Sequence, residues 1–145
     1  MGGLAMPRAP KRLLQLHEGP EPLFHKQGIE EQLEAVNSRH VPLGLGGSLV
    51  IDQTEALVAI DVNSGKFRDH NDAEKTAFKT NQEAVKEVVR QLRLRDLGGL
   101  VVIDFIDMRD RKNQREIERS LRELLKEDRA KTEQSRMSRF GIIEL

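Results

Sequence analysis

Two aspartates stand where carboxylates often do chemistry, each directly after an apolar run that is typical of a β-strand. Asp61 follows Ala56–Ile60, and Asp104 follows Leu100–Ile103. Ligand sites in α/β sheets collect at the carboxyl ends of strands, and a carboxylate there is costly unless something compensates its charge. If the two strands are neighbours, both side chains can face one ion. Magnesium binds through one or two protein carboxylates with water and phosphate oxygens, so Asp61 and Asp104 are predicted metal ligands.

The loop after the first aspartate contains further polar groups. Asn63 is predicted to orient a phosphate oxygen or a metal-bound water, and Gly65 lets the backbone approach a ligand closely. Lys66 and Arg68 supply positive charge against a phosphate. A purely structural role stays open as the alternative, because an aspartate at a strand end is also a common cap or turn residue. Asp107 is either a third ligand or a carboxylate that caps the next helix or orients a ligand.

The basic residues fall into two groups with different predicted roles. Glutamates are interspersed along the long predicted helix, which favours solvated ion pairs over RNA contact for Arg90, Arg93 and Arg95. The later basic stretch is poor in acids after Glu133, and phosphate contact is predicted for Arg129, Lys131, Arg136 and Arg139. The four histidines have no metal-ligand spacing and do not accompany a plausible serine nucleophile.

Composition excludes several classes of protein. The 145 residues have a formal net charge of +0, so any RNA contact must be local rather than a property of the whole surface. There is no Cys, hence no disulfide, thiolate zinc site or thiol nucleophile. No apolar run is long enough to span a membrane, and no secretory signal is recognisable, so a cytoplasmic location is expected. Trp and Tyr are absent, which leaves little material for stacking bases and indicates an incomplete RNA-binding surface.

Hydrophobic periodicity predicts an α/β fold, with α+β as the alternative, in which a mixed β-sheet has flanking helices. Residues 1–23 are predicted to form a linker or arm and 24–145 a single domain. Asp52 and Glu55 are assigned to the turn of a hairpin, and the strand 100–106 is predicted to be buried on both faces. The predicted elements are a helix at 28–39, strands at 48–52 and 55–61, a helix at 72–93, a strand at 100–106, a helix starting near Asn113, and a strand at 140–145.

Several blocks of the sequence, taken together, resemble the RNase E/G family of endoribonucleases, in the subdomain described as DNase I-like. The resemblance covers about Phe24 to Leu145, and the blocks occur in the family's order and spacing. They are Gly46–Leu57, Ile60–Gly65, Asn81 with Glu83–Ala84, Arg90–Gly99, Val102–Met108 and Ser138–Gly141.

The resemblance implies an enzyme that cleaves single-stranded RNA with Mg²⁺, for which Mn²⁺ can substitute. The family's two metal-binding aspartates match Asp61 and Asp104, and its catalytic asparagine matches Asn63. The implied reaction is hydrolysis of a phosphodiester by metal-activated water, leaving a 5′-phosphate and a 3′-hydroxyl. Lys131 matches a basic residue near the family's 5′-monophosphate pocket. Together with Asn63, Lys66 and Arg139, it is an expected RNA contact.

The same resemblance implies parts that this sequence lacks. These are the OB-fold domain that binds the RNA strand, the 5′-monophosphate pocket, and the cysteine pair of a zinc link through which the family forms dimers and tetramers. The chain by itself is therefore expected to bind metal weakly and to cleave RNA poorly or not at all. The alternative is a non-catalytic scaffold or assembly module that retains the family fold. A metal-dependent phosphatase also fits an aspartate pair but does not explain the matching blocks.

Overall fold

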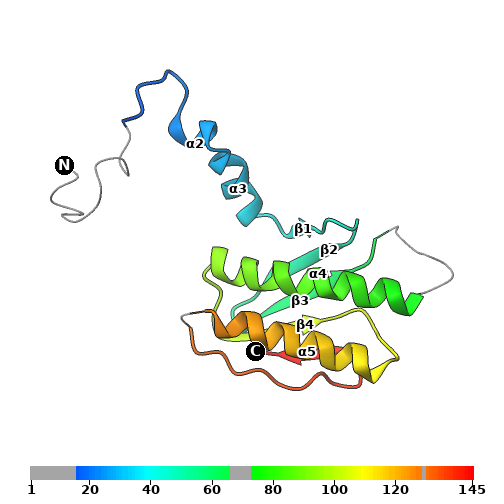
Figure 1. The fold of residues 1–145 in the computed structure, drawn as a ribbon. Helices are drawn as coiled ribbons and strands as arrows, with labels where there is room; N and C mark the ends of the chain where they lie inside the picture. The colour runs from blue at the N-terminus through cyan, green and yellow to red at the C-terminus, as the bar shows by residue number, and fades with distance from the viewer. Residues whose placement is uncertain (1–15, 66–72, 129) are drawn as a thin grey trace. The chain divides into compact units, whose positions relative to one another are not determined.

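A computed structural model describes residues 16–65, 73–128 and 130–145 of the chain (Figure 1). The chain divides into two compact units, Met1–Glu34 and Ala35–Leu145, and each is described by itself. Lys66 and Arg68, the two cations predicted to contact phosphate in the loop after Asn63, lie outside the described residues.

Two short helices belong wholly or largely to the first unit. Helix α2 covers Leu23–Lys26 and has no buried residue, and helix α3 covers Ile29–Val36. The predicted helix at 28–39 is therefore present but shorter. The proposed boundary between an arm and a domain at residue 24 stays a prediction.

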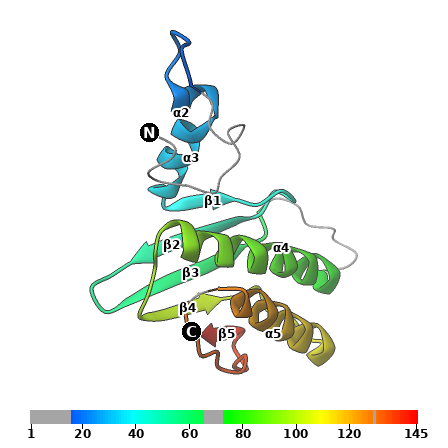
Figure 2. The same ribbon diagram turned by 60° about the vertical axis from the view of Figure 1, so that its left-hand side comes forward.

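Five strands of the second unit form one mixed sheet in the order β1-β2-β3-β4-β5 (Figure 2). The pairs β1–β2, β2–β3 and β4–β5 are antiparallel, whereas β3 and β4 are parallel. A parallel pair needs a crossover connection, which the long helix between them provides. The predicted mixed sheet with flanking helices is confirmed, and its class is α+β. The strands are His40–Pro42, Ser48–Gln53, Leu57–Asn63, Leu100–Asp104 and Ile142–Glu144.

Helices α4 (Ala73–Leu94) and α5 (Arg111–Lys126) cover one face of this sheet (Figure 1). Alternate strand residues point into the layer between sheet and helices, where Ile60 and Ile103 are fully buried against Val85 and Ile117. Both helices have the apolar stripes that their sequence periodicity predicts.

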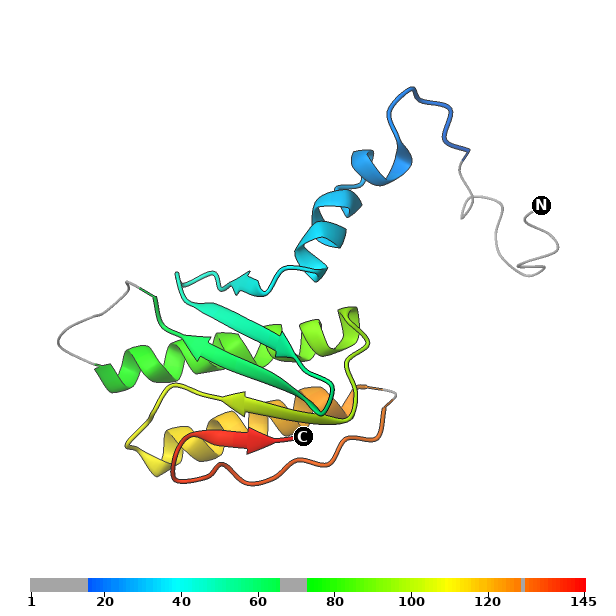
Figure 3. The same ribbon diagram turned by 180° about the vertical axis from the view of Figure 1, so that it is seen from behind.

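The other face of the sheet carries no helix of the second unit within the described residues (Figure 3). This overturns the prediction that the strand at 100–106 is buried on both faces. Only Val101 and Ile103 of β4 are buried, and Leu100 is 47% exposed. A continuous apolar run does not distinguish one covered face from two, because the number of layers is set by elements elsewhere in the chain.

The hairpin between β2 and β3 is confirmed, and Glu55 lies in its turn as predicted, whereas Asp52 does not. The Thr54 hydroxyl accepts hydrogen bonds from the backbone N–H groups of Ala56 and Leu57 and donates to the Leu57 carbonyl. Asp52 instead belongs to β2, where it forms an ion pair with Arg39.

Helix α5 also begins earlier than the predicted start near Asn113. Asp110 is its N-cap residue, and the Asp110 carboxylate accepts a hydrogen bond of 2.8 Å from the Lys112 backbone N–H. Among the residues that the structure describes, no helix is both long and apolar enough to cross a bilayer.

Candidate active site

The two predicted metal ligands occupy the same level of neighbouring strands. In the parallel pair of β3 and β4, Asp61 is the register partner of Asp104, and each lies at or near the carboxyl end of its strand. Both side chains are exposed, and the buried residues next to them, Ile60 and Ile103, point to the helices. The two carboxylates therefore lie side by side on the sheet face opposite to α4 and α5, on strands about 4.8 Å apart.

Asn63 lies two residues beyond Asp61 on the same face of β3. Its side-chain amide donates a hydrogen bond of 2.8 Å to Asp61 Oδ2. This contact restricts the rotation of the Asp61 carboxylate and leaves its other oxygen turned away from Asn63. The structure thus brings together the three residues predicted to be catalytic, and it shows that Asn63 orients a carboxylate.

Negative charge accumulates at this end of the sheet. Burial raises the pKa of Asp104, and the neighbouring carboxylates of Asp61 and then Asp107 raise it further. A raised carboxyl pKa means that the ionised form is disfavoured, so a cation bound between the carboxylates would relieve the repulsion. The donor set of two carboxylate groups and a nearby amide suits a hard, oxygen-binding ion such as Mg²⁺.

Asp107 does not complete a three-carboxylate metal site. Within residues 16–65, 73–128 and 130–145, no three His, Cys, Asp or Glu side chains are grouped so that they could hold an ion. Nor does Asp107 cap helix α5, a role taken by Asp110. Its effect in the structure is electrostatic, through the pKa of Asp104.

The loop between β4 and α5, which follows Asp104 directly, is held by two side chains of α4. Asn81 is fully buried, and its amide pairs with both backbone groups of Ile106: Nδ2 donates to the carbonyl at 2.8 Å, and Oδ1 accepts from the N–H at 3.0 Å. Glu74 accepts hydrogen bonds from the backbone N–H groups of Arg109 and Asp110, at 2.7 and 3.2 Å.

Asn81 is a polar residue on the buried side of α4, and its structural role was not predicted from the sequence. The signal was present, because a polar residue at a core position of an amphipathic helix is expected to have hydrogen-bond partners. The partner itself, 25 residues away, had no local signature. Asn81 and Glu74 are therefore positioning residues for the segment that carries Asp104 and Asp107.

The Glu74 contact predicts a pH-dependent difference in stability. Burial raises the pKa of Glu74, but hydrogen bonds from Arg109, Asn113 and Asp110 outweigh it, so the pKa is lowered overall. A carboxyl with a lowered folded-state pKa contributes stability above its unfolded-state pKa of about 4.3, and this is lost as the pH falls through the folded-state value. We expect Glu74→Gln to lower the free energy of unfolding by about 1 kcal/mol at pH 7, because glutamine has one acceptor oxygen instead of two.

Urea unfolding of both proteins between pH 7 and pH 3 measures this contribution. The difference between wild type and Glu74→Gln should shrink as the pH falls below about 4. A difference that stays constant over that range would contradict a role for the ionised Glu74 carboxylate.

Gly65 has a structural role that the sequence did not indicate. Its expected approach to a ligand stays a prediction, but its close neighbour in the structure is the chain itself. Gly65 has a φ of 62°, and a Cβ atom there would collide with the backbone carbonyl oxygen of Gly46 in the turn between β1 and β2. The glycine therefore allows the end of β3, just after Asn63, to pack on the Gly46–Gly47 backbone.

Gly65→Ala is expected to destabilise the protein by about 1–2 kcal/mol from the left-handed backbone alone, and to weaken metal binding by displacing Asn63. Gly98→Ala is the matched control, because a Cβ atom at Gly98 would have no neighbour within 4 Å and the residue has no positive φ. Thermal unfolding and titration with Mg²⁺ measure the two effects. Equal behaviour of both variants would show that the close approach at Gly65 is not important.

The structure separates the two remaining predicted RNA contacts. Arg139 lies in the segment that leads into β5, at the same end of the sheet as Asp104, since Asp104 pairs with Ile142. Lys131 lies instead near the start of β4, where it lines a pocket with Gly98, Gly99 and Leu145. Lys131 is thus separated from the aspartate pair by roughly the length of β4.

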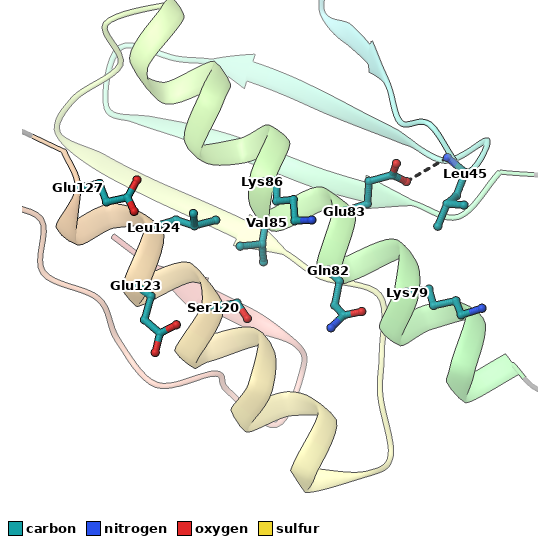
Figure 4. A pocket seen from close by; sticks show the side chains of 10 residues that line it. All are labelled: Leu45, Lys79, Gln82, Glu83, Val85, Lys86, Ser120, Glu123, Leu124 and Glu127. Atoms are coloured by element: carbon teal, nitrogen blue, oxygen red, sulfur yellow. Dashed lines mark hydrogen bonds between the residues drawn. The ribbon is translucent and has the colours of Figure 1, made fainter.

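Arg90 and Arg93 of α4 form ion pairs as predicted, with Glu87 and Asp128. Arg95, which follows the end of α4, instead donates to the Ser38 carbonyl and to Gln91 Oε1. A groove of about 610 Å³ between α4 and α5 has a mixed charge rather than a basic lining (Figure 4). Its charged residues are Lys79, Glu83, Lys86, Glu123 and Glu127, and Glu83 also binds the Leu45 backbone N–H.

Comparison with known proteins identifies the class to which this fold and aspartate pair belong. Residues 4–145 match the Ribonuclease E/G family, and the chain belongs to that family. It is 53% identical over 132 residues to Ribonuclease E of Escherichia coli, and these aligned residues make up 91% of this chain and 12% of that protein. It is 44% identical over 134 residues to the chloroplastic Ribonuclease E/G-like protein of Arabidopsis thaliana, covering 91% of this chain and 13% of the relative.

Ribonuclease G of Escherichia coli is 41% identical over 132 residues, which make up 91% of this chain and 27% of that protein. The chain therefore spans a small part of the length of these relatives, and the activity of a whole protein is not assigned by the match alone.

Proposed function

We propose that this chain forms the metal-binding catalytic part of an endoribonuclease that hydrolyses phosphodiester bonds in single-stranded RNA. The observation that carries the proposal is the register of Asp61 with Asp104, which sets two carboxylates side by side on an exposed sheet face. Membership of the Ribonuclease E/G family supports RNA as the substrate. A cytoplasmic location is part of the same proposal.

In this proposal Asp61 and Asp104 hold Mg²⁺, for which Mn²⁺ can substitute. When bound, such an ion supplies a hydroxide at neutral pH and offsets charge that develops on the phosphate. Asn63 keeps the Asp61 carboxylate in one orientation through its hydrogen bond of 2.8 Å. Attack on the phosphorus leaves a 5′-phosphate on one product and a 3′-hydroxyl on the other.

Four residues are proposed to contact the RNA backbone: Asn63, Lys66, Lys131 and Arg139. Lys131 and Arg139 lie toward opposite ends of β4, so they cannot share one phosphate. An RNA strand that contacts both residues must therefore run along the sheet. The OB-fold domain and the zinc-linked oligomer that the family resemblance implies would be contributed by segments outside this chain.

Manganese binding tests the metal site directly. Mn²⁺ is paramagnetic and broadens the NMR signals of nuclei close to it. Addition of substoichiometric Mn²⁺ to the ¹⁵N-labelled chain is expected to broaden the amide signals around Asp61, Asn63 and Asp104, and excess Mg²⁺ is expected to restore them. Broadening elsewhere, or none, would refute the assignment of these ligands.

RNA cleavage tests the reaction itself. The native protein that contains this chain should cut a 5′-labelled single-stranded RNA internally with Mg²⁺, but should leave it intact with a chelator and leave a duplex intact. The products should carry a 5′-phosphate, which is detected by ligation without prior phosphorylation. Metal binding without cleavage, even in the native protein that contains this chain, would favour the non-catalytic scaffold.

A further inference from the structure

Phe140 is a large apolar side chain left in solvent. It is 62% exposed, whereas Phe105, directly after β4, is 3% exposed and belongs to the core. The guanidinium carbon of Arg139 lies 4.7 Å from the centre of the Phe140 ring. This is a cation–π contact, in which the cation lies over the aromatic ring. The ring therefore has a cationic neighbour and a large surface open to water.

The turn that carries Phe140 is held firmly by hydrogen bonds. The Ser138 hydroxyl accepts from the backbone N–H groups of Phe140 and Ile142, at 3.1 and 3.2 Å. The Ser138 carbonyl accepts from the Gly141 N–H at 3.1 Å, and the Ser138 N–H donates to the Ile142 carbonyl at 2.8 Å. A rigid turn that presents an aromatic side chain loses little conformational entropy when the ring binds a ligand.

Close packing fixes this turn against the strand that carries Asp104. The Phe105 N–H donates to the Gly141 carbonyl at 3.2 Å. Gly141 has a φ of 78°, and a Cβ atom there would lie 2.9 Å from the Phe105 carbonyl oxygen, so only glycine allows the approach.

The register places Phe140 close to the aspartate pair. Asp104 is the partner of Ile142, two residues beyond Phe140. The Phe105 N–H to Gly141 carbonyl hydrogen bond of 3.2 Å joins the residues next to Asp104 and Phe140, so standard backbone dimensions keep the Cα atoms of Asp104 and Phe140 within about 12 Å of each other. One nucleotide can span this distance. An RNA strand whose phosphate lies at Asp61 and Asp104 can therefore set an adjacent base near the Phe140 ring.

We propose that Phe140 stacks against a base of the single-stranded RNA, next to the phosphate held at the aspartate pair, and that Arg139 lies between the ring and the RNA backbone. The proposal rests on the function proposed above and adds a base-binding residue to it. Every base has a π-face, so the contact holds the strand without selecting its sequence. A duplex keeps its bases inside the stack, so the same contact favours single strands.

Binding is measured with the Asp61→Asn/Asp104→Asn protein, which is not expected to cut the strand, and a fluorescein-labelled single-stranded RNA. In that background Phe140→Ala should raise the dissociation constant by about tenfold, Phe140→Leu by a similar factor, and Phe140→Trp should bind at least as tightly as Phe140. Leu94→Ala is the matched control, because Leu94 is also exposed, at 46%, but lies at the end of α4, on the other side of the sheet. It should leave the dissociation constant unchanged.

Unchanged binding by Phe140→Ala, or full binding by Phe140→Leu, would overturn stacking. Because the ring is exposed, the unfolding temperature of Phe140→Ala should equal that of wild type, which separates a contact with RNA from loss of folding.

Abasic RNA locates the stacked base. A single abasic nucleotide is moved along the strand, and at one position it should weaken binding as much as Phe140→Ala does, with no further loss when both changes are combined. Additive losses at every position would contradict a base–ring contact. If only the stacking proposal is wrong, the protein still cleaves RNA with metal, but Phe140→Ala does not weaken binding. If only the proposed function is wrong, Phe140→Ala weakens RNA binding, but no RNA is cleaved. The two outcomes are therefore distinguishable.

Discussion

Replacing Asp61 and Asp104 together by asparagine is expected to abolish metal binding and to lower RNA cleavage by at least about a thousandfold in the native protein that contains this chain. Asparagine keeps the size of the side chain but removes the charge that attracts a divalent ion. The loss is large because the proposed reaction depends on the ion that these two carboxylates would hold.

Thermal unfolding with and without Mg²⁺ measures the binding step on its own. Wild type should become more stable as Mg²⁺ is added, since a ligand that binds only the folded state stabilises it, and the double variant should not respond. Without metal, the double variant should be at least as stable as wild type. The reason is that burial, and then the carboxylates of Asp61 and Asp107, raise the pKa of Asp104, so the ionised Asp104 carboxylate is disfavoured in the wild-type chain.

Asp52→Asn is the matched control for the double variant. Asp52 lies on the neighbouring strand β2, but its register partner is Ala59, and its carboxylate pairs with Arg39. Its replacement should leave the response to Mg²⁺ unchanged. A double variant that still gains stability from Mg²⁺ would show that the ion binds elsewhere, and the active-site assignment would then be wrong.

Asn81→Leu is expected to lower the free energy of unfolding by about 2–4 kcal/mol, the second largest effect that we predict. Leucine has a similar volume but cannot pair with Ile106, so a backbone N–H and a carbonyl lose their partners beside a fully buried position. Asn81→Asp should also destabilise the protein, because a carboxylate can accept from the N–H but would face the Ile106 carbonyl with a negative charge.

Urea unfolding at pH 7 measures the loss, and Asn113→Leu is the control because Asn113 makes a single hydrogen bond to Glu74. A smaller loss is expected for the control. If Asn81 positions the loop after Asp104, Asn81→Leu should also weaken Mg²⁺ binding under conditions where the protein is still folded. Stability loss with unchanged metal affinity would limit Asn81 to a structural role.

The local elements followed from the sequence because each depends on neighbouring residues. The period of apolar residues in the predicted helix 72–93 and the apolar run of Ala56–Ile60 were sufficient to predict α4 and β3, with ends that differ by a few residues. The errors were also local, at Asp52 and Asn113, where several polar residues compete for a turn or a cap. Asp110 and Thr54 took those roles because their side chains reach the backbone N–H groups that lack other partners.

The sequence by itself determined the secondary structure, the family, and the presence of an aspartate at the end of each of two strands. Tertiary structure decided that these strands are neighbours in matching register, so that Asp61 lies beside Asp104. It also decided that Asn81 binds Ile106, that the sheet has one covered face, and that Phe140 stays in solvent. The physical reason is that periodicity reports which face of an element is apolar, whereas strand order and long-range pairing depend on how distant elements pack.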